Sequence, residues 1–467
     1  MTATAAPRRN SLNAGLALLL LFLVTRAVNW WVWQQPAASF VANDVSYYSY
    51  YTWCFDKGLL EGSAQCVEAA SGLGIMAEYP LPAQWILQGI YALAGGFEPY
   101  FNWFAGLMLF LDVVVAASLF RRGNAKGALV WILFTAAGGP IMYFRFDLIP
   151  AALVVWACMF LAVRPYLAGS LVAMGAAVKL WPALLALPLA APNPLRPGHG
   201  RARLLGFVGA GFALGMSSLL LGGWTRSISP LVWQSRRGLQ MESVPATPLM
   251  FLRTFTDNQA WPVFLSQYNA LELQGPGVGL LLQVSSVLTV GWVVLTAVLA
   301  WRLLRHFRRQ TPALHEAMLL VVLASVLATI VANKTLSPQY ILWLGGPLSV
   351  LVMSRRSAWL RSPLNIITIA LIVVAGLTQY TYPWGTFGIM GMPNGSPLET
   401  SLLLLRNVLL IVVTLYTIHL AWRITGRVQE PADHEESDEE ARGTRIDDPP
   451  LHAAPAPHGD ERTDTLP

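Results

Sequence analysis

Long apolar runs recur along this chain from Leu12 to Trp422, and they constrain its fold more than any other feature. Each run is close to the ~20 residues that a helix needs to cross the hydrocarbon core of a bilayer. The runs do not alternate apolar and polar residues, as the strands of a membrane barrel do. The runs must therefore be helices, because lipid offers no hydrogen-bond partner to backbone N–H and C=O groups and a helix pairs these groups within itself. We therefore expect an all-α, polytopic integral membrane protein.

The composition agrees with this fold class. Hydrophobic residues make up 55% of the chain and charged residues only 12%, whereas a soluble domain carries about 25% charged residues. The net charge of +6 comes from short basic clusters between the apolar runs. Such clusters mark the cytoplasmic side of a membrane protein. The basic balance therefore indicates orientation in a membrane and not binding to nucleic acid.

Placing every basic cluster inside predicts about twelve membrane segments with both termini in the cytoplasm. Two of them are short helices between residues 165 and 192 that meet at Lys179, because this stretch has too few residues for two full crossings. The other segments are expected at 12–33, 101–120, 127–143, 148–163, 204–222, 276–301, 314–332, 337–353, 363–381 and 399–422.

Two long loops are expected on the outer side, at about 34–100 and 223–275. The first is acidic and contains an apolar stretch, 82–96, that we interpret as a helix lying on the outer interface. Cys54 and Cys66 share this loop, where the environment permits a disulfide. Together, residues 1–427 are expected to form one transmembrane domain. The acidic, proline-rich segment 428–467 is expected to be a disordered cytoplasmic tail.

Asp44 follows the first apolar run and has Tyr47 and Tyr48 beside it. A carboxylate among aromatic rings suits a general base that takes a proton from a hydroxyl, and the rings suit contacts with a sugar. The alternative is a solvated loop aspartate or a helix N-cap. Glu78 precedes two prolines and either supports the base and binds acceptor hydroxyls or has a structural role only.

Two cations lie where packing alone does not explain them. Arg145 is followed closely by Asp147 and either pairs with it or binds a phosphate, for which its planar fork is suited. Lys179 lies between short apolar segments and is followed by Trp181. Snorkelling to an interface is the plain interpretation of this lysine. Because the segments are short, and because ionisable groups within membranes are costly, anion binding is favoured.

The remaining candidates lie in the second outer loop and in a later outer hairpin. They combine cations with hydrogen-bonding groups, which suits a phosphate and sugar hydroxyls, although a stabilising ion-pair cluster is the alternative for the loop. Arg26 adds one more outer cation. Neither a zinc-type His/Cys cluster nor a glycine-rich nucleotide loop is found in the sequence, which disfavours a nucleotide-driven pump. The candidates in the second outer loop and the later hairpin are Arg237, Gln240, Glu242, Lys334, Gln339 and Tyr340.

With these motifs in order, the chain resembles glycosyltransferase family 87, membrane enzymes of the GT-C fold that include mycobacterial polyprenol-phosphate-mannose-dependent mannosyltransferases. The likeness spans roughly residues 12–425. It rests on Asp44 with Tyr47 and Tyr48, on Arg145-Phe146-Asp147 with Pro150, on Ala177-Val178-Lys179-Leu180-Trp181-Pro182, on the stretch from Arg237 to Ser243, and on Leu336-Ser337-Pro338-Gln339-Tyr340.

The resemblance implies transfer of a sugar from a polyprenyl-phosphate donor, with inversion, at the outer face of the plasma membrane. Asp44 matches the family's catalytic base, while Lys179, Arg145 and Arg237 match cations near the donor phosphate, and neither a metal nor another cofactor is required. The histidine that some relatives use at the donor has no counterpart, since neither long outer loop contains a histidine. The composition and the family together suggest an actinobacterial source.

The expected activity is therefore transfer of a sugar, with mannose the expected one, to an outer glycolipid or glycan during cell-envelope biosynthesis. The alternatives are a transporter or flippase for a lipid-linked sugar and a non-catalytic membrane protein of envelope assembly. Transporters often contain inverted repeats, and no internal repeat is found in this sequence. The sequence distinguishes neither mannose from arabinose nor one acceptor from another.

Overall fold

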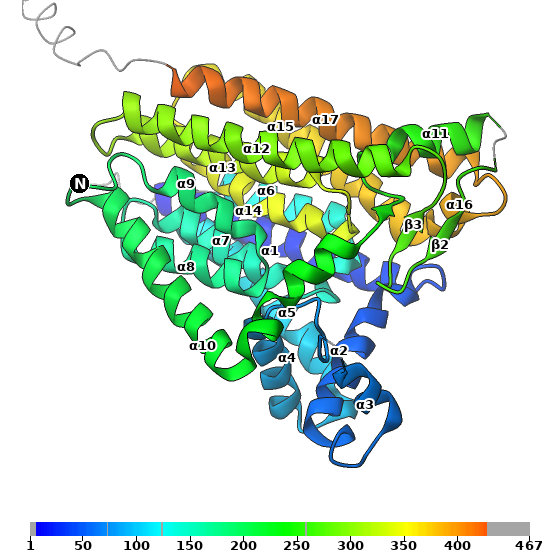
Figure 1. Ribbon diagram of the computed structural model, residues 1–467. Coiled ribbons are helices and arrows are strands. Elements are labelled where there is room, and N and C mark those ends of the chain that lie inside the picture. The colour runs from blue at the N-terminus through cyan, green and yellow to red at the C-terminus, as the bar shows by residue number, and fades with distance from the viewer. Residues whose placement is uncertain (1–5, 72, 123–124, 257–258, 427–467) are drawn as a thin grey trace, which may run out of the picture. The chain divides into compact units, whose positions relative to one another are not determined.

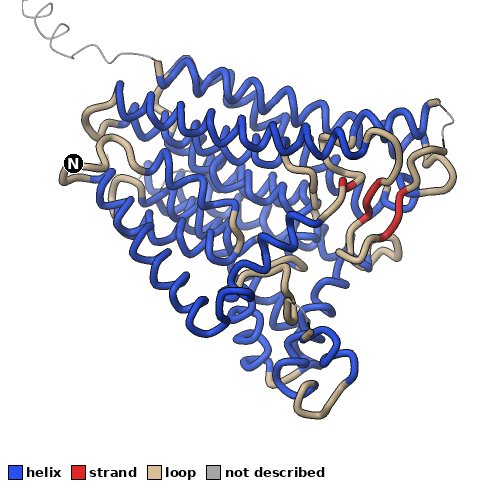
Figure 2. Tube along the Cα trace, in the orientation of Figure 1, coloured by secondary structure: helices blue, strands red, loops and turns tan. Residues whose placement is uncertain are grey.

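The computed structural model describes residues 6–71, 73–122, 125–256 and 259–426. The predicted tail at 428–467 lies outside the described residues. Helices account for most of the described chain, and strands are confined to one small sheet (Figure 2). The expected all-α polytopic fold class is confirmed.

Seven helices within the described ranges are long and apolar enough to cross a membrane. The other predicted segments also fall on helices, but these are shorter: α6 (Ala125–Gly138), α7 (Leu148–Phe160), α8 (Pro165–Val178), α9 (Ala186–Leu189) and α14 (Leu342–Ser354). The seven long helices are α1 (Ala6–Trp33), α5 (Phe97–Arg122), α10 (His199–Arg236), α12 (Val278–His306), α13 (Pro312–Ala332), α15 (Arg361–Gln379) and α17 (Pro397–Thr425).

Helix α13 forms the centre of the packing. It is buried along most of its length and lies against α12, α14 and α17 (Figure 1). Helices α8 and α10 pack most closely, because two glycines face the neighbouring backbone. A Cβ on Gly169 would collide with the main-chain oxygen of Arg203, and one on Gly206 with that of Tyr166. Small residues at such crossings let apolar helices approach each other closely.

The chain breaks at Lys179, where the sequence predicts that two short helices meet. Helix α8 ends at Val178, Lys179 is extended, and the short helix η4 (Trp181–Leu185) follows. Pro182 lies in the first turn of η4, where a missing N–H is tolerated. Because of this break, Lys179 lies between two helices, and its side chain can reach neighbouring segments.

The first long loop is mostly helical. It contains η1 (Ser39–Ala42), α2 (Asn43–Trp53), η2 (Cys54–Gly58), α3 (Ala64–Ala70) and α4 (Leu81–Ala94), the last on the stretch expected to lie at the interface. A disulfide joins Cys54 to Cys66, as the sequence predicts, and ties η2 to α3.

The helix predicted to end at residue 222 is broken at Gly223, and the second predicted loop begins with a further helical stretch. Gly223 adopts φ 69°, ψ 178°, so the chain bends there, but α10 resumes and continues to Arg236. A three-stranded antiparallel sheet follows in the order β1-β3-β2, with α11 (Thr247–Phe255) between its first two strands in the sequence. The strands are β1 (Leu239–Gln240), β2 (Val263–Leu265) and β3 (Leu271–Leu273).

The sheet, α11 and α16 (Thr386–Met390) lie at one end of the helices (Figure 1). A second apolar cluster forms there between the sheet, α11 and α17 and includes Met250, Ile389 and Leu403. The remaining short helices are η3 (Pro140–Tyr143), η5 (Pro338–Ile341), η6 (Ala358–Leu360) and η7 (Tyr380–Trp384).

Candidate active site

A cavity of about 1470 Å³ opens among α2, η4, the end of α10, the sheet, α12, η5 and η7. Tyr48, expected to contact a sugar, does not line it. Its ring is buried in the core against Phe104 and Phe146, because the next residue on a helix points about 100° away from its predecessor. The other predicted site residues all line the cavity: Asp44, Tyr47, Glu78, Arg145, Lys179, Arg237, Gln240, Glu242, Lys334, Gln339 and Tyr340.

Asp44 lies in the first turn of α2 and forms an ion pair with Arg145, with 2.8 Å between Oδ2 and Nε. The contact is electrostatic, without the alignment of a hydrogen bond. Arg145 is buried, and its other nitrogens donate to the Val41 carbonyl at 2.9 Å and to the Tyr382 hydroxyl at 3.2 Å. The alternative in which Arg145 pairs with Asp147 is therefore wrong, because its partner is Asp44.

The environment of Asp44 increases the affinity of its carboxylate for a proton. Burial raises the pKa of the Asp44 carboxyl, and the neighbouring Asp147 carboxylate adds to the rise. Arg145 and Lys179 lower this pKa, but by less than burial raises it. A carboxylate with a raised pKa holds a proton more strongly, which improves a general base as long as the group is ionised at the working pH.

Lys179 is held by Asp147, with distances of 2.7 and 2.8 Å from its Nζ to the two carboxylate oxygens. Asp147 is buried and also accepts a hydrogen bond from Trp343 Nε1 at 2.9 Å. Lys179 Nζ lies 4.9 Å from the centre of the Tyr340 ring. The lysine does not snorkel to an interface, because it is paired and covered by rings.

Three aromatic rings are stacked on one another beside Lys179. The Trp181 and Trp343 rings are stacked with 5.0 Å between their centres, and Tyr340 continues the stack at 4.2 Å from Trp343. All three line the cavity. They give this side of the cavity an apolar surface.

A second cationic group lies where α10 ends. Arg237 Nε is 3.9 Å from Glu272 Oε1, beyond hydrogen-bond distance. Lys334 Nζ donates to the main-chain carbonyls of Ser235 at 3.0 Å and Arg237 at 2.7 Å. Burial lowers the pKa of the Lys334 ammonium, and the positive charge of Arg237 lowers it further.

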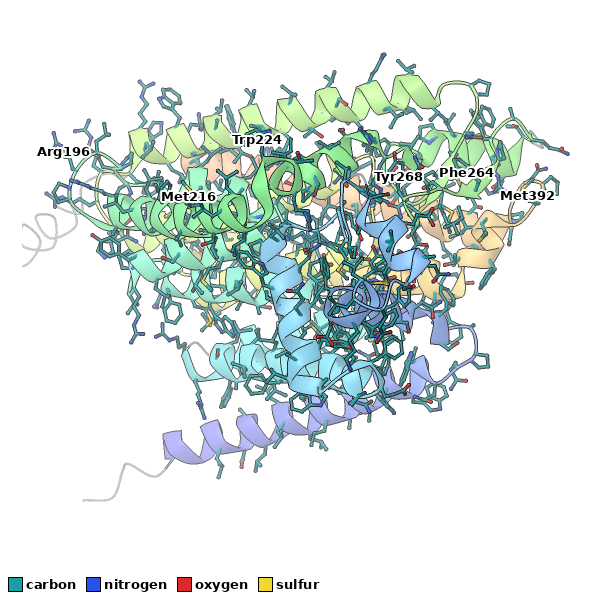
Figure 3. All side chains as sticks on the ribbon, turned by 60° about the horizontal axis from the view of Figure 1, so that its bottom comes forward. Arg196, Met216, Trp224, Phe264, Tyr268 and Met392 are labelled. Atoms are coloured by element: carbon teal, nitrogen blue, oxygen red, sulfur yellow. A yellow bond between two sulfur atoms is a disulfide. The ribbon has the colours of Figure 1, made fainter. Side chains whose placement is uncertain are left out.

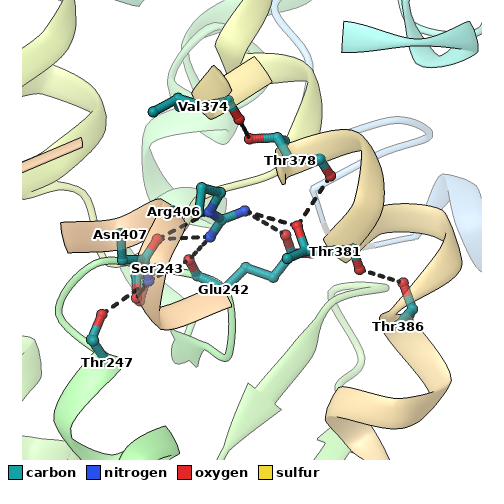
Figure 4. Close-up of polar contacts among 9 residues, drawn as sticks. All are labelled: Glu242, Ser243, Thr247, Val374, Thr378, Thr381, Thr386, Arg406 and Asn407. Carbon is teal, nitrogen blue, oxygen red and sulfur yellow. Dashed lines mark hydrogen bonds and ion pairs between the residues drawn. The ribbon is translucent and has the colours of Figure 1, made fainter. Parts of the chain in front are cut away.

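Glu242 follows β1 and is paired with Arg406 of α17, with 2.9 Å between Oε2 and Nη1 (Figure 4). Both side chains are buried. Burial raises the pKa of the Glu242 carboxyl more than Arg406 lowers it. Glu242 borders the cavity, whereas Arg406 lies behind it.

The family model for glycosyltransferase family 87 matches residues 79–330, more than half of the chain. The chain belongs to glycosyltransferase family 87. No curated protein matches it. The matched range contains Arg145, Lys179, Arg237 and Glu242, whereas Asp44 precedes it and Lys334 follows it.

In this membrane glycosyltransferase, the Tyr47 hydroxyl donates to Glu78 Oε1 at the cavity wall. Burial raises the pKa of the Glu78 carboxyl, and the Tyr47 hydrogen bond opposes that rise. Arg226, not singled out from the sequence, donates to the Tyr79 carbonyl at 2.8 Å. It therefore ties the Glu78 turn to the second half of α10.

Arg26 of the glycosyltransferase is not among the cavity residues, although the sequence marks it as one more outer cation. Its Nε and Nη2 donate to the two oxygens of Asp112 at 2.8 and 2.9 Å. Trp131 and Thr135 complete this buried network among α1, α5 and α6. The charge of Arg26 is therefore used in packing.

Several cavity residues of the glycosyltransferase were not predicted. Tyr382 and Trp343 lie in apolar runs without a neighbouring charged motif, so the sequence carries no signal for them. Tyr268, labelled in Figure 3, lies between β2 and β3, and its ring packs edge-on against Trp233 with 5.1 Å between centres. Within the described ranges, no group of three or more His, Cys, Asp or Glu side chains is arranged to hold a metal.

Proposed function

We propose that this glycosyltransferase moves a sugar, with mannose the first candidate, from a polyprenyl-phosphate donor to an outer glycolipid or glycan acceptor. The transfer inverts the anomeric centre and serves cell-envelope biosynthesis at the plasma membrane. The observation that carries the proposal is the position of Asp44: it lines a large cavity, is paired with Arg145, and has a raised pKa.

The proposed reaction is a single displacement. The acceptor hydroxyl attacks the anomeric carbon from the face opposite the phosphate, and its proton passes to Asp44. The bond between the anomeric carbon and the phosphate oxygen breaks, and its electron pair leaves with the phosphate. No acid is needed at the leaving oxygen because the phosphate departs as an anion, unlike the alcohol released by a glycosidase.

Positive charge in the cavity supports a phosphate leaving group, since preorganised cations stabilise charge that develops in a transition state. Arg145 and Lys179 are each already paired with a carboxylate. Arg237 and Lys334 have no carboxylate within hydrogen-bond distance. We assign the phosphate to Arg237 and Lys334, with Arg145 and Lys179 nearer the reacting carbon.

The lipid part of the donor needs an apolar path. Leu180, Ala183 and Leu184 of the η4 region face the cavity, and so does Trp292 of α12. These groups suit an isoprenoid chain. The cavity lies beside the two predicted outer loops, and positive residues favour the cytoplasm. We therefore assign the reaction to the extracytoplasmic side, with both termini inside and no cofactor.

The test supplies the purified protein in lipid nanodiscs with radiolabelled polyprenyl-phosphate mannose and a glycolipid extract. We expect a labelled glycolipid whose new linkage has the opposite anomeric configuration to the donor. A product with retained configuration would contradict the single displacement. In sealed vesicles, movement of the donor between leaflets without a glycosidic product would contradict transfer and identify a flippase.

A further inference from the structure

The guanidinium of Arg406 donates hydrogen bonds to Glu242 at two points. Arg406 Nη1 donates to Glu242 Oε2 at 2.9 Å, and Arg406 Nη2 donates to the Glu242 main-chain carbonyl (Figure 4). Both the side chain and the backbone of Glu242 are therefore fixed relative to α17. Arg406 lies 76 positions beyond the range matched by the family model, which ends at residue 330 (406 − 330 = 76).

All five donors of the buried Arg406 have partners. Besides the two bonds to Glu242, its nitrogens reach Asn407 Oδ1 at 3.1 and 2.9 Å and Thr381 Oγ1 at 3.4 Å. Asn407 in turn donates to Thr247 Oγ1 at 2.9 Å. A buried arginine is tolerated when it is paired and its donors are all used. The network thus supports the charge and leaves no donor of Arg406 for a ligand.

On the cavity side, by contrast, some hydrogen-bond acceptors of Glu242 and Gln240 have no donor among the described residues. Arg406 occupies Oε2 of Glu242, while Oε1 accepts no hydrogen bond from the described residues. Gln240, two residues earlier, also lines the cavity, and its buried Oε1 has no partner among the described residues. A buried acceptor without a partner carries a free-energy cost. The ligand that relieves this cost must bring hydrogen-bond donors.

A phosphate brings acceptors and negative charge, so it does not suit this part of the cavity. A cation would suit Glu242, but Arg406 already balances that carboxylate. Neutral hydroxyl groups donate without adding charge. Tyr382, which bonds Arg145 beside Asp44, lies close enough to both Asp44 and Glu242 to be affected by their charges. The unused acceptors are therefore near the proposed base.

We propose that Glu242 and Gln240 form a hydroxyl-binding subsite that selects the sugar, and that Arg406 is the positioning residue that orients Glu242. The proposal rests on the proposed function for the identity of the ligand as a sugar. It adds specificity-determining residues and a positioning residue that acts from α17, behind the cavity wall.

The experiment compares polyprenyl-phosphate mannose with its monodeoxy analogues as donors, and octyl mannoside with its monodeoxy analogues as acceptors. A site built to bind a hydroxyl rejects the analogue that lacks it by up to about 10⁴-fold. We expect the wild-type enzyme to reject one deoxy compound strongly, and the series in which this occurs identifies the donor or the acceptor as the ligand. The discrimination ratio is kcat/KM for the parent compound divided by kcat/KM for the rejected deoxy analogue. This ratio does not depend on how much of the enzyme is folded.

In Glu242→Gln and in Arg406→Gln, this ratio is expected to fall to about tenfold or less, with Arg406→Lys retaining part of it. The double variant Glu242→Gln with Arg406→Met leaves no unpaired buried charge and should show the same loss. Glu399→Gln is the matched control, since Glu399 bonds Ser396 and does not line the cavity. Its ratio should equal that of the wild type.

Variants that lose activity while keeping the wild-type ratio would overturn the subsite and leave Glu242 a structural residue. Equilibrium binding of the same compounds is measured in parallel. If no donor supports transfer, the proposed function fails, but loss of hydroxyl discrimination in binding would still support the subsite. Equal binding of parent and deoxy compounds by the wild-type protein would overturn it.

Discussion

Arg145 and Arg237 differ in how closely a carboxylate approaches the guanidinium, and this difference affects how each can bind a phosphate. A phosphate that approaches Arg145 is repelled by Asp44, which lies 2.8 Å from the guanidinium. At Arg237 the nearest carboxylate is 3.9 Å away, and Lys334 adds a second positive charge. Because Coulomb interactions in a partly buried site are only weakly screened, this difference decides where an anion binds.

Arg237→Gln should therefore weaken the use of the donor. A hydrogen bond to a charged group contributes about 1.5–3 kcal/mol, which corresponds to a loss of about 10- to 100-fold in kcat/KM for the polyprenyl-phosphate sugar. Steady-state kinetics with varied donor concentration measures the effect. Arg236→Gln removes the same charge one residue earlier from an exposed side chain that does not line the cavity. An equal loss in both variants would show that only the general positive potential matters.

At the level of single residues, the sequence predicted which side chains are unusual but not their partners. Apolar surroundings marked Lys179 and Arg145, yet Arg145 pairs with Asp44 across 101 positions (145 − 44 = 101) and not with the nearby Asp147. The partner of a buried charge depends on tertiary packing, which the local pattern does not contain. Arg406 was missed although a charged residue within a long apolar helix is itself a signal.

At the level of elements, hydropathy was sufficient to place the helices, because a segment that crosses lipid must satisfy its own backbone. The break at Lys179 followed from segment length alone. The end predicted for a helix at residue 222 agrees with the non-helical backbone of Gly223, at which α10 is broken. The small sheet was not predicted, since strands as short as Leu239–Gln240 leave no alternating pattern.

The buried network among α1, α5 and α6 has a testable consequence for stability. Asp112→Asn leaves Arg26 without its charged partner, and breaking a buried pair on one side costs about 3–5 kcal/mol. We expect a clear drop in unfolding temperature in detergent, measured by tryptophan fluorescence. The double variant Arg26→Leu with Asp112→Leu removes both charges and should be less destabilised. A single variant as stable as the wild type would show that the pair contributes nothing to the association of these helices.

For the whole molecule, the cavity gathers residues from Phe40 to Met390, so nearly the full membrane part contributes to one site. The sequence indicated most of the polar residues that line it. It did not reveal that Tyr48 lies in the core, because the spacing of neighbouring tyrosines on a short helix does not say which face is buried. The family match supports glycosyl transfer, and the geometry supports Asp44 as the base.

The most direct test is the transfer rate of Asp44→Asn with polyprenyl-phosphate mannose, measured beside Asp56→Asn, which changes an exposed carboxylate of the same loop. A general base contributes about 10²–10⁴-fold. Asp44→Asn should lower kcat at least about 10²-fold while the protein inserts normally and still binds the donor. The kcat of Asp56→Asn should match that of the wild type. Turnover by Asp44→Asn within a few-fold of the wild type would contradict the assignment of Asp44 as the catalytic base.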